Sequence, residues 1–238
     1  MWGAAGMSLW LALMLGAAAP ATLTPQHESA SASTQSLDER ADHIADLIVT
    51  KRMADAAPLI DPLLDEYEKV YVSEKRSVYC AADAAEARRY LAGPAREKPP
   101  RPAVAIGKGW CVALWAKGYA LNDAGHAADA IPYLVRAAGM RPGHRQYWAE
   151  LGFAYQATKN WPAMLDVGGR AAALAAEATG PERTSWLCKA WHSMAYAQIE
   201  LGSWDDAIAS LNKCLALDPD NAKAKNELNY IAHSRPKG

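Results

Sequence analysis

The sequence lacks the short motifs by which many enzymes are recognised. Its 238 residues hold no glycine-rich phosphate loop, no HExxH zinc motif and no GxSxG nucleophile motif. Cys188 and His192, one helical turn apart, come nearest to a metal-binding pair. Their positions in an internal repeat explain both residues without a metal. We therefore expect no enzymatic activity, no metal and no cofactor.

An excess of charge of one sign is also missing. The 25 Lys and Arg residues nearly balance the 26 Asp and Glu residues, which leaves a formal net charge of −1. A nucleic-acid-binding protein normally presents a basic face, so the balance argues against a nucleic-acid partner. Strand-like alternation of apolar and polar residues is nearly absent and alanine is abundant, which favours an all-α protein.

What the sequence has instead is an internal repeat. Gly118, Gly152 and Ala195 are separated by 34 and then 43 residues, and other positions recur with the same spacing. Each unit holds two apolar patterns of helical spacing with a short polar break between them. A period near 34 with small residues at matching places predicts a solenoid of helix hairpins. The three units are 111–144, 145–178 and 188–221.

Aromatic and small residues recur at set places within these units. They are Trp148, Leu151, Gly152, Tyr155 and Trp161 in the second unit, and Trp191, Ala195, Gly202, Trp204, Ala207, Ala216 and Pro219 in the third. This pattern resembles the tetratricopeptide repeat (TPR) family. The resemblance implies an all-α, right-handed α-solenoid whose first helices line a concave face.

Small residues also predict where the two helices of a hairpin touch. Antiparallel helices approach closely only where a side chain is small. We therefore expect Gly118 to face Ala130 and Gly152 to face Met164 in tight contacts.

The segments around the repeats extend the helical prediction. Residues 179–187 are an insertion in which Gly180 and Pro181 indicate an early start of the next helix. We expect a capping helix over 222–236, with Leu228 and Ile231 facing inward. Before the repeats, the sequence predicts an N-terminal helical region over 37–93, with a degenerate repeat near 41–71, and a proline-rich connector over 94–110.

The N-terminus resembles a secretory signal. An apolar, uncharged run is followed by Ala19-Pro20-Ala21, so residues 1–21 are predicted to be a signal peptide and 22–36 a flexible linker. This places the mature protein in the periplasm or outside the cell. A signal peptide normally has Lys or Arg before its apolar run, and this chain has none, so an uncleaved membrane anchor is the alternative. No other membrane contact is expected.

Four cysteines in an exported chain favour disulfides. If Ala195 faces Ala207 across antiparallel helices, residues whose numbers sum to 402 lie opposite each other. Cys188 and Cys214 meet this condition at the open end of the third hairpin. The remaining pair, Cys80 and Cys111, would then join the starts of two helices. Free thiols in small-residue positions are the alternative.

The residue after each small contact residue should point into the concave groove. An aromatic residue occupies this place in every unit: Tyr119, Phe153 and Tyr196. Trp115, His192, Asn122 and Gln156 lie about one turn away on the same face. Some TPR proteins hold a peptide's C-terminal carboxylate here with Lys, Arg and Asn, but aromatic residues and His192 replace that clamp in this chain. Support of neighbouring helices is the alternative role for the aromatic residues.

Three functions fit this surface. The first is a non-enzymatic scaffold that binds a protein or peptide through the aromatic groove. The second is an accessory subunit of a cell-envelope enzyme or glycan-processing complex, because aromatic surfaces also bind sugars. The third is an assembly module whose repeats stack on a second copy as a homo-oligomer.

Overall fold

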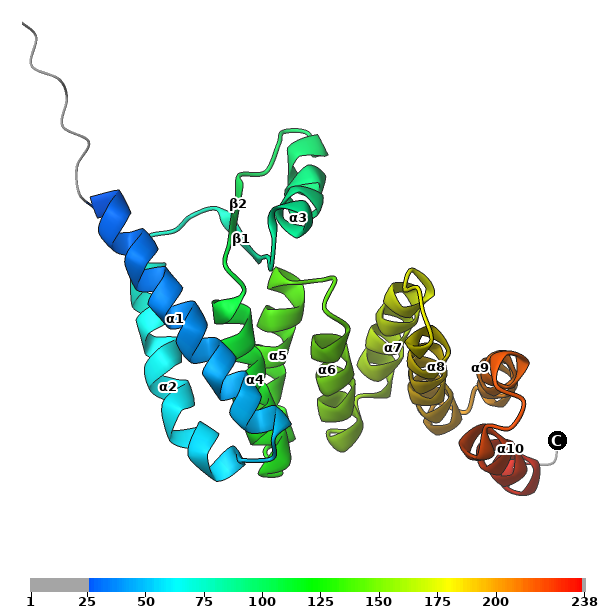
Figure 1. Ribbon diagram of the computed structural model, residues 1–238. Coiled ribbons are helices and arrows are strands. Elements are labelled where there is room, and N and C mark those ends of the chain that lie inside the picture. The colour runs from blue at the N-terminus through cyan, green and yellow to red at the C-terminus, as the bar shows by residue number, and fades with distance from the viewer. Residues whose placement is uncertain (1–25, 237–238) are drawn as a thin grey trace, which may run out of the picture.

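The computed structural model of the protein describes residues 26–236, so the predicted signal peptide over 1–21 lies outside the described residues. Helix hairpins follow one another in a row from α1 to α10, and α3 projects from one side of it (Figure 1). The helices are α1 (Gln26–Val49), α2 (Met53–Val70), α3 (Ala84–Arg96), α4 (Gly109–Asp123), α5 (Ala127–Met140), α6 (Arg145–Ala157), α7 (Trp161–Ala176), α8 (Glu182–Glu200), α9 (Trp204–Leu217) and α10 (Ala222–Ser234). The strands are β1 (Ser77–Cys80) and β2 (Ala103–Ile106). The predicted all-α solenoid is confirmed as the fold class.

The same turn closes each of the hairpins α4–α5, α6–α7 and α8–α9. One residue with positive φ follows the first helix: Gly125 (80°), Lys159 (56°) and Gly202 (76°). The next backbone N–H then donates to a carbonyl five residues earlier, as from His126 to Leu121 at 2.8 Å. This hydrogen bond satisfies a carbonyl that the helix end would otherwise leave unpaired. A shared turn gives the three hairpins a common geometry.

The α1–α2 hairpin has this turn as well. Lys51 has a φ of 61°, and the N–H of Arg52 donates to the carbonyl of Leu47 at 2.7 Å. Ala56 of α2 is fully buried, as is Ala130, which lies 74 residues later in α5. The region near 41–71 therefore has the architecture of a fourth hairpin. Since α1 begins at Gln26, the flexible linker predicted over 22–36 is wrong from that residue onward.

The segment between α2 and α4 differs from the prediction. Instead of continuous helix followed by a proline-rich connector, β1 and β2 pair in parallel, with Ser77 opposite Ala103 and Cys80 opposite Ile106. Helix α3 connects them and begins after Asp83, whose side chain accepts hydrogen bonds from two backbone N–H groups. Four-residue strands are too short to show a clear alternation in sequence, which is why the all-helical prediction missed them. We call this β1–α3–β2 segment the insert.

A buried ion pair and a disulfide fix the insert to the hairpins. Glu86 of α3 pairs with Arg141 at 3.0 Å, and both side chains are almost fully buried. Tyr90 donates its hydroxyl hydrogen to Glu86 at 2.6 Å and accepts from the N–H of Gly143 at 3.0 Å. Burial opposes ionisation of Glu86, but the hydrogen bonds from Arg141 and Tyr90 outweigh it and lower its pKa to about 2.

Both expected cysteine pairs are disulfides in the structure. Cys80–Cys111 joins the end of β1 to the first turn of α4. Cys80 therefore lies in a strand, not at the start of a helix as predicted. Cys188–Cys214 joins α8 to α9 at the open end of their hairpin, with Cα atoms 4.8 Å apart. Each disulfide links segments that are distant in sequence, which restricts the unfolded chain.

The buried apolar residues form two clusters. The first extends through α1, α2, α4, α5 and α6 to Val167 of α7, and the second joins α8, α9 and α10. Ile231 of α10 is buried in the second cluster and Leu228 packs against it, so α10 covers the last hairpin. None of the helices over residues 26–236 combines the length and apolar character needed to cross a bilayer.

We predict that Glu86→Gln destabilises the protein by about 3 kcal/mol, because it leaves the Arg141 charge buried without its partner. Glu97→Gln is the matched control in the same insert. Glu97 pairs with Arg101 at the surface, where water screens the charges, so its loss should destabilise the protein far less. Urea unfolding at pH 7 measures both variants. Equal stability of the two variants would contradict the role given to the buried pair.

Candidate functional site

The repeat is interrupted at one buried position. Leu134 of α5 and Leu211 of α9 occupy equivalent places, and both are fully buried. Gly168 of α7 stands at the same place in the middle hairpin, 34 residues after the first leucine and 43 before the second. A methyl group on Gly168 would lie only 2.8 Å from Cγ of Met194, so glycine at this place lets α8 pack closely against α7.

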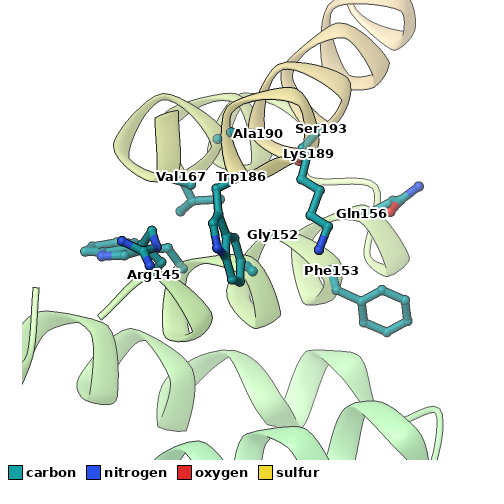
Figure 2. Close-up of a pocket in the computed structure, with 13 residues that line it drawn as sticks. Arg145, Gly152, Phe153, Gln156, Val167, Trp186, Lys189, Ala190 and Ser193 are labelled. Atoms are coloured by element: carbon teal, nitrogen blue, oxygen red, sulfur yellow. The ribbon is translucent and has the colours of Figure 1, made fainter. Parts of the chain in front are cut away.

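A pocket opens at this place between α6, α7 and α8 (Figure 2). Its volume is about 190 Å³ and its surface is mostly apolar. We call it the Gly168 pocket. Its lining comes from Arg145, Trp148, Ala149, Gly152, Phe153 and Gln156 of α6, from Val167, Gly168 and Ala171 of α7, and from Trp186, Lys189, Ala190 and Ser193 of α8.

Trp186 reaches the pocket because α8 is longer than its counterparts. The helix has 19 residues against 13 in α6, and its start at Glu182 lies within the predicted insertion 179–187. Trp186 belongs to this extra length and projects toward α6 (Figure 2). A second departure from the repeat thus supplies a wall of the pocket that the first departure borders.

Two cations flank the ring of Trp186. The guanidinium of Arg145 lies 5.1 Å from the ring centroid and the ammonium of Lys189 lies 4.8 Å from it. Figure 2 shows the indole between these two side chains. Such cation–π contacts hold the ring in place and give the mouth of an apolar pocket a positive rim. Phe153 lies at the same mouth with about half of its surface exposed (52%).

The expected groove residues do not share one surface. Phe153 and Gln156 line the Gly168 pocket. Trp115 and Tyr119, whose rings are 5.7 Å apart, line a separate hollow between α1, α4 and α6. Tyr196 packs edge-on against Trp161 with ring centroids 5.7 Å apart. The structure therefore divides the predicted aromatic row into three places.

Asn122 and His192 are buried and bonded within the chain, which corrects their placement in an open groove. Asn122 donates from Nδ2 to the carbonyl of Glu150 at 3.2 Å. His192 contacts Glu227 through Nδ1 and Asn221 through Nε2, both at 3.1 Å. Helix α10 carries Glu227, so the capping helix covers the place that the sequence assigned to the groove.

The hollow beside Trp115 also contains a partly buried histidine. The ring of His144 lies tilted against that of Tyr147 with ring centroids 4.0 Å apart. Burial, assisted by the nearby Arg141 charge, lowers the pKa of His144 to about 4. The ring is therefore neutral near pH 7.

Among the residues that the structure describes, no group of three or more metal-binding side chains occurs, and Cys188 is held in its disulfide.

The tight contacts of the small residues also differ from the prediction. A methyl group on Gly118 would overlap the side chain of Leu134, not that of Ala130. The nearest side-chain atoms to such a group on Gly152 belong to Val167 at 3.5 Å and Ser193 at 3.8 Å, so Met164 is not its partner. Side chains of a helix lean toward its N-terminus. The residue that covers each glycine therefore lies about one turn after the residue that was predicted to face it.

Comparison with known proteins identifies one repeat. A family model described as a tetratricopeptide repeat matches residues 189–221, which span most of α8 and all of α9. The chain contains a TPR. No curated protein matches the sequence.

One similar solved structure is the first TPR of Spaghetti (RPAP3) bound to the HSP90 peptide SRMEEVD. It is 22% identical to this chain, with a TM-score of 0.45. The match covers 52% of this chain and 91% of that chain.

The sequence analysis missed Gly168, Trp186, Arg145 and Lys189. A signal for Gly168 was available, because leucine stands at both equivalent positions of the other hairpins. Trp186 was visible only as part of an insertion without a counterpart. The convergence of Arg145 and Lys189 on one ring depends on how α6 and α8 pack, which no local pattern encodes.

We predict that alanine has opposite effects at Gly118 and Gly152. Gly118→Ala should destabilise the protein by about 1–3 kcal/mol, because the new methyl group displaces a fully buried leucine. Gly152→Ala meets only ordinary contacts and should gain up to about 1 kcal/mol of helix propensity. Chemical unfolding of both variants tests this. A loss at Gly152 as large as that at Gly118 would show that the pocket is not open at that residue.

Proposed function

We propose that the protein is a non-enzymatic scaffold that binds a protein or peptide, and that the Gly168 pocket receives a side chain of this partner. The main support is the convergence of two departures from the repeat at one place. Gly168 lets α8 pack closely against α7, and the longer α8 brings Trp186 to the opening. Close packing of α8 on α7 alone would account for the glycine but not for the added tryptophan.

The pocket has the properties of a side-chain site. Its floor is apolar, formed by Gly168, Val167 and small residues. Burying one large apolar side chain there would contribute roughly 1.5–3 kcal/mol, which is enough for a main anchor. The exposed ring of Phe153 extends the apolar surface beyond the opening and offers a second contact.

A sugar fits the pocket less well than an apolar side chain. Sugars present hydroxyl groups along their edges, and those groups lose water when they are buried. The floor of the Gly168 pocket offers them few polar partners, since the lining is mostly apolar. The scaffold therefore has stronger support than a role in glycan processing.

We also propose that the protein acts outside the cytoplasm, in the periplasm or as a secreted protein. The apolar run and Ala19-Pro20-Ala21 support export. All four cysteines are in disulfides, which persist in oxidising compartments and are rare in the cytosol.

For partner binding we predict that Trp186→Ala and Phe153→Ala reduce capture of a specific partner from envelope extract. The loss should reach about tenfold or more for Trp186, as for other central aromatic anchors. Tyr230→Ala is the control, because it removes an aromatic residue of α10 that is similarly exposed (56%) but lies outside the pocket.

Quantitative mass spectrometry of the captured proteins, with thermal unfolding of each variant, measures these effects. A partner that all three variants retain equally would refute the proposed site. Retention of glycans by the wild type and loss by Trp186→Ala, with no protein captured, would favour the glycan-processing alternative.

For localisation we predict that the native protein begins near Thr22 and is absent from the cytosolic fraction. Intact-mass measurement of protein from fractionated cells gives the N-terminus directly. An intact residue Met1 on protein in the membrane fraction would favour the anchored alternative, and the same N-terminus in the cytosol would contradict export.

A further inference from the structure

We infer that the partner segment is acidic: an apolar residue enters the Gly168 pocket, and a neighbouring Asp or Glu side chain meets the cations at its mouth. This inference rests on the proposed function. It concerns side-chain carboxylates within a segment, so it requires no free C-terminus. The observations behind it are the charges around Trp186 and their lack of partners.

Arg145 and Lys189 lie on opposite helices of the pocket and both contact the ring of Trp186. Neither forms an ion pair with any carboxylate among the side chains that the structure describes. Arg170 of α7 shows the contrast. It stacks over Trp148 at 5.2 Å but also pairs with Asp166 at 3.0 Å.

The pocket itself supplies no negative charge, because its lining contains neither Asp nor Glu. Outside the lining, Glu182 contacts this wall and accepts a hydrogen bond from Nε1 of Trp186 at 3.4 Å. The Nε atom of Arg145 is buried without a hydrogen-bond acceptor in the described part of the chain. Arg145 makes no side-chain hydrogen bond to the described residues, so nothing in that part of the chain competes with an incoming carboxylate for the accessible part of its guanidinium.

These charges act beside an apolar surface, which strengthens them. A low-dielectric wall screens a charge less than water does, so a carboxylate next to the pocket is attracted more strongly than one at an open surface. A basic partner segment would be repelled by the same two cations. Shape therefore selects the apolar anchor and charge selects its acidic neighbour.

An array of random 12-residue peptides, each fixed through its C-terminus, tests this inference with the purified protein. No peptide then has a free C-terminal carboxylate. We expect the bound peptides to share an apolar residue adjacent to Asp or Glu, and their binding to weaken as salt is raised. Trp186→Ala should abolish binding. Lys189→Glu should weaken it about fivefold or more, since one rim charge is reversed.

Lys213→Glu is the matched control, because Lys213 is an exposed lysine of α9 that lies outside the pocket. It should leave peptide binding unchanged. An equal loss in Lys213→Glu and Lys189→Glu would show a general effect of net charge and overturn the inference.

The outcomes separate the two proposals. Peptides that are neutral or basic, but still depend on Trp186, would overturn the acidic partner and leave the scaffold function intact. Binding that Lys189→Glu does not weaken would do the same. If no peptide binds in a Trp186-dependent manner, both the peptide-binding function of the pocket and the inference drawn from it fail.

Discussion

The structure depends on the stacking of helix hairpins, because a single hairpin cannot bury its apolar face alone. Each hairpin has the same left-handed turn, at Lys51, Gly125, Lys159 and Gly202, so consecutive pairs can stack in one row. Leu134 and Leu211 fill the space within this stack. Where Gly168 replaces leucine, the buried apolar residues separate into two clusters, and the pocket lies near their boundary. The candidate site is therefore a local exception to the constraint that shapes the rest of the protein.

The two disulfides act at different places in this stack. Cys80–Cys111 and the Glu86–Arg141 pair hold the insert against the N-terminal hairpins. Cys188–Cys214 joins α8 to α9 next to the added length of α8. Trp186 lies two residues before Cys188, so the helix that presents the indole is anchored close to it. Fixing one end of a side-chain site in this way lowers the entropy lost when a partner binds.

The chemistry of the Gly168 pocket comes from residue types that the repeat does not require. The hairpins depend on small and aliphatic residues, whereas Arg145, Lys189 and Phe153 add little to the core and are wholly or partly accessible to solvent. Their positions bring opposite properties together, with an apolar floor beneath a cationic rim. Binding of a mixed apolar and acidic segment would use both properties, while packing of the solenoid uses only the apolar one.

The sequence by itself determined the hairpins and the opposition of Cys188 to Cys214, because both follow from local periodicity and antiparallel geometry. It also indicated the hairpin near 41–71 through the match between Ala56 and Ala130. Only the tertiary structure decided the pairing of β1 with β2, since the two strands are short and more than twenty residues apart. It likewise separated the predicted groove residues, because α10 buries His192 while Trp115 and Phe153 line different hollows. Local patterns fix how each helix forms, but the surroundings of a side chain depend on neighbours contributed by other helices.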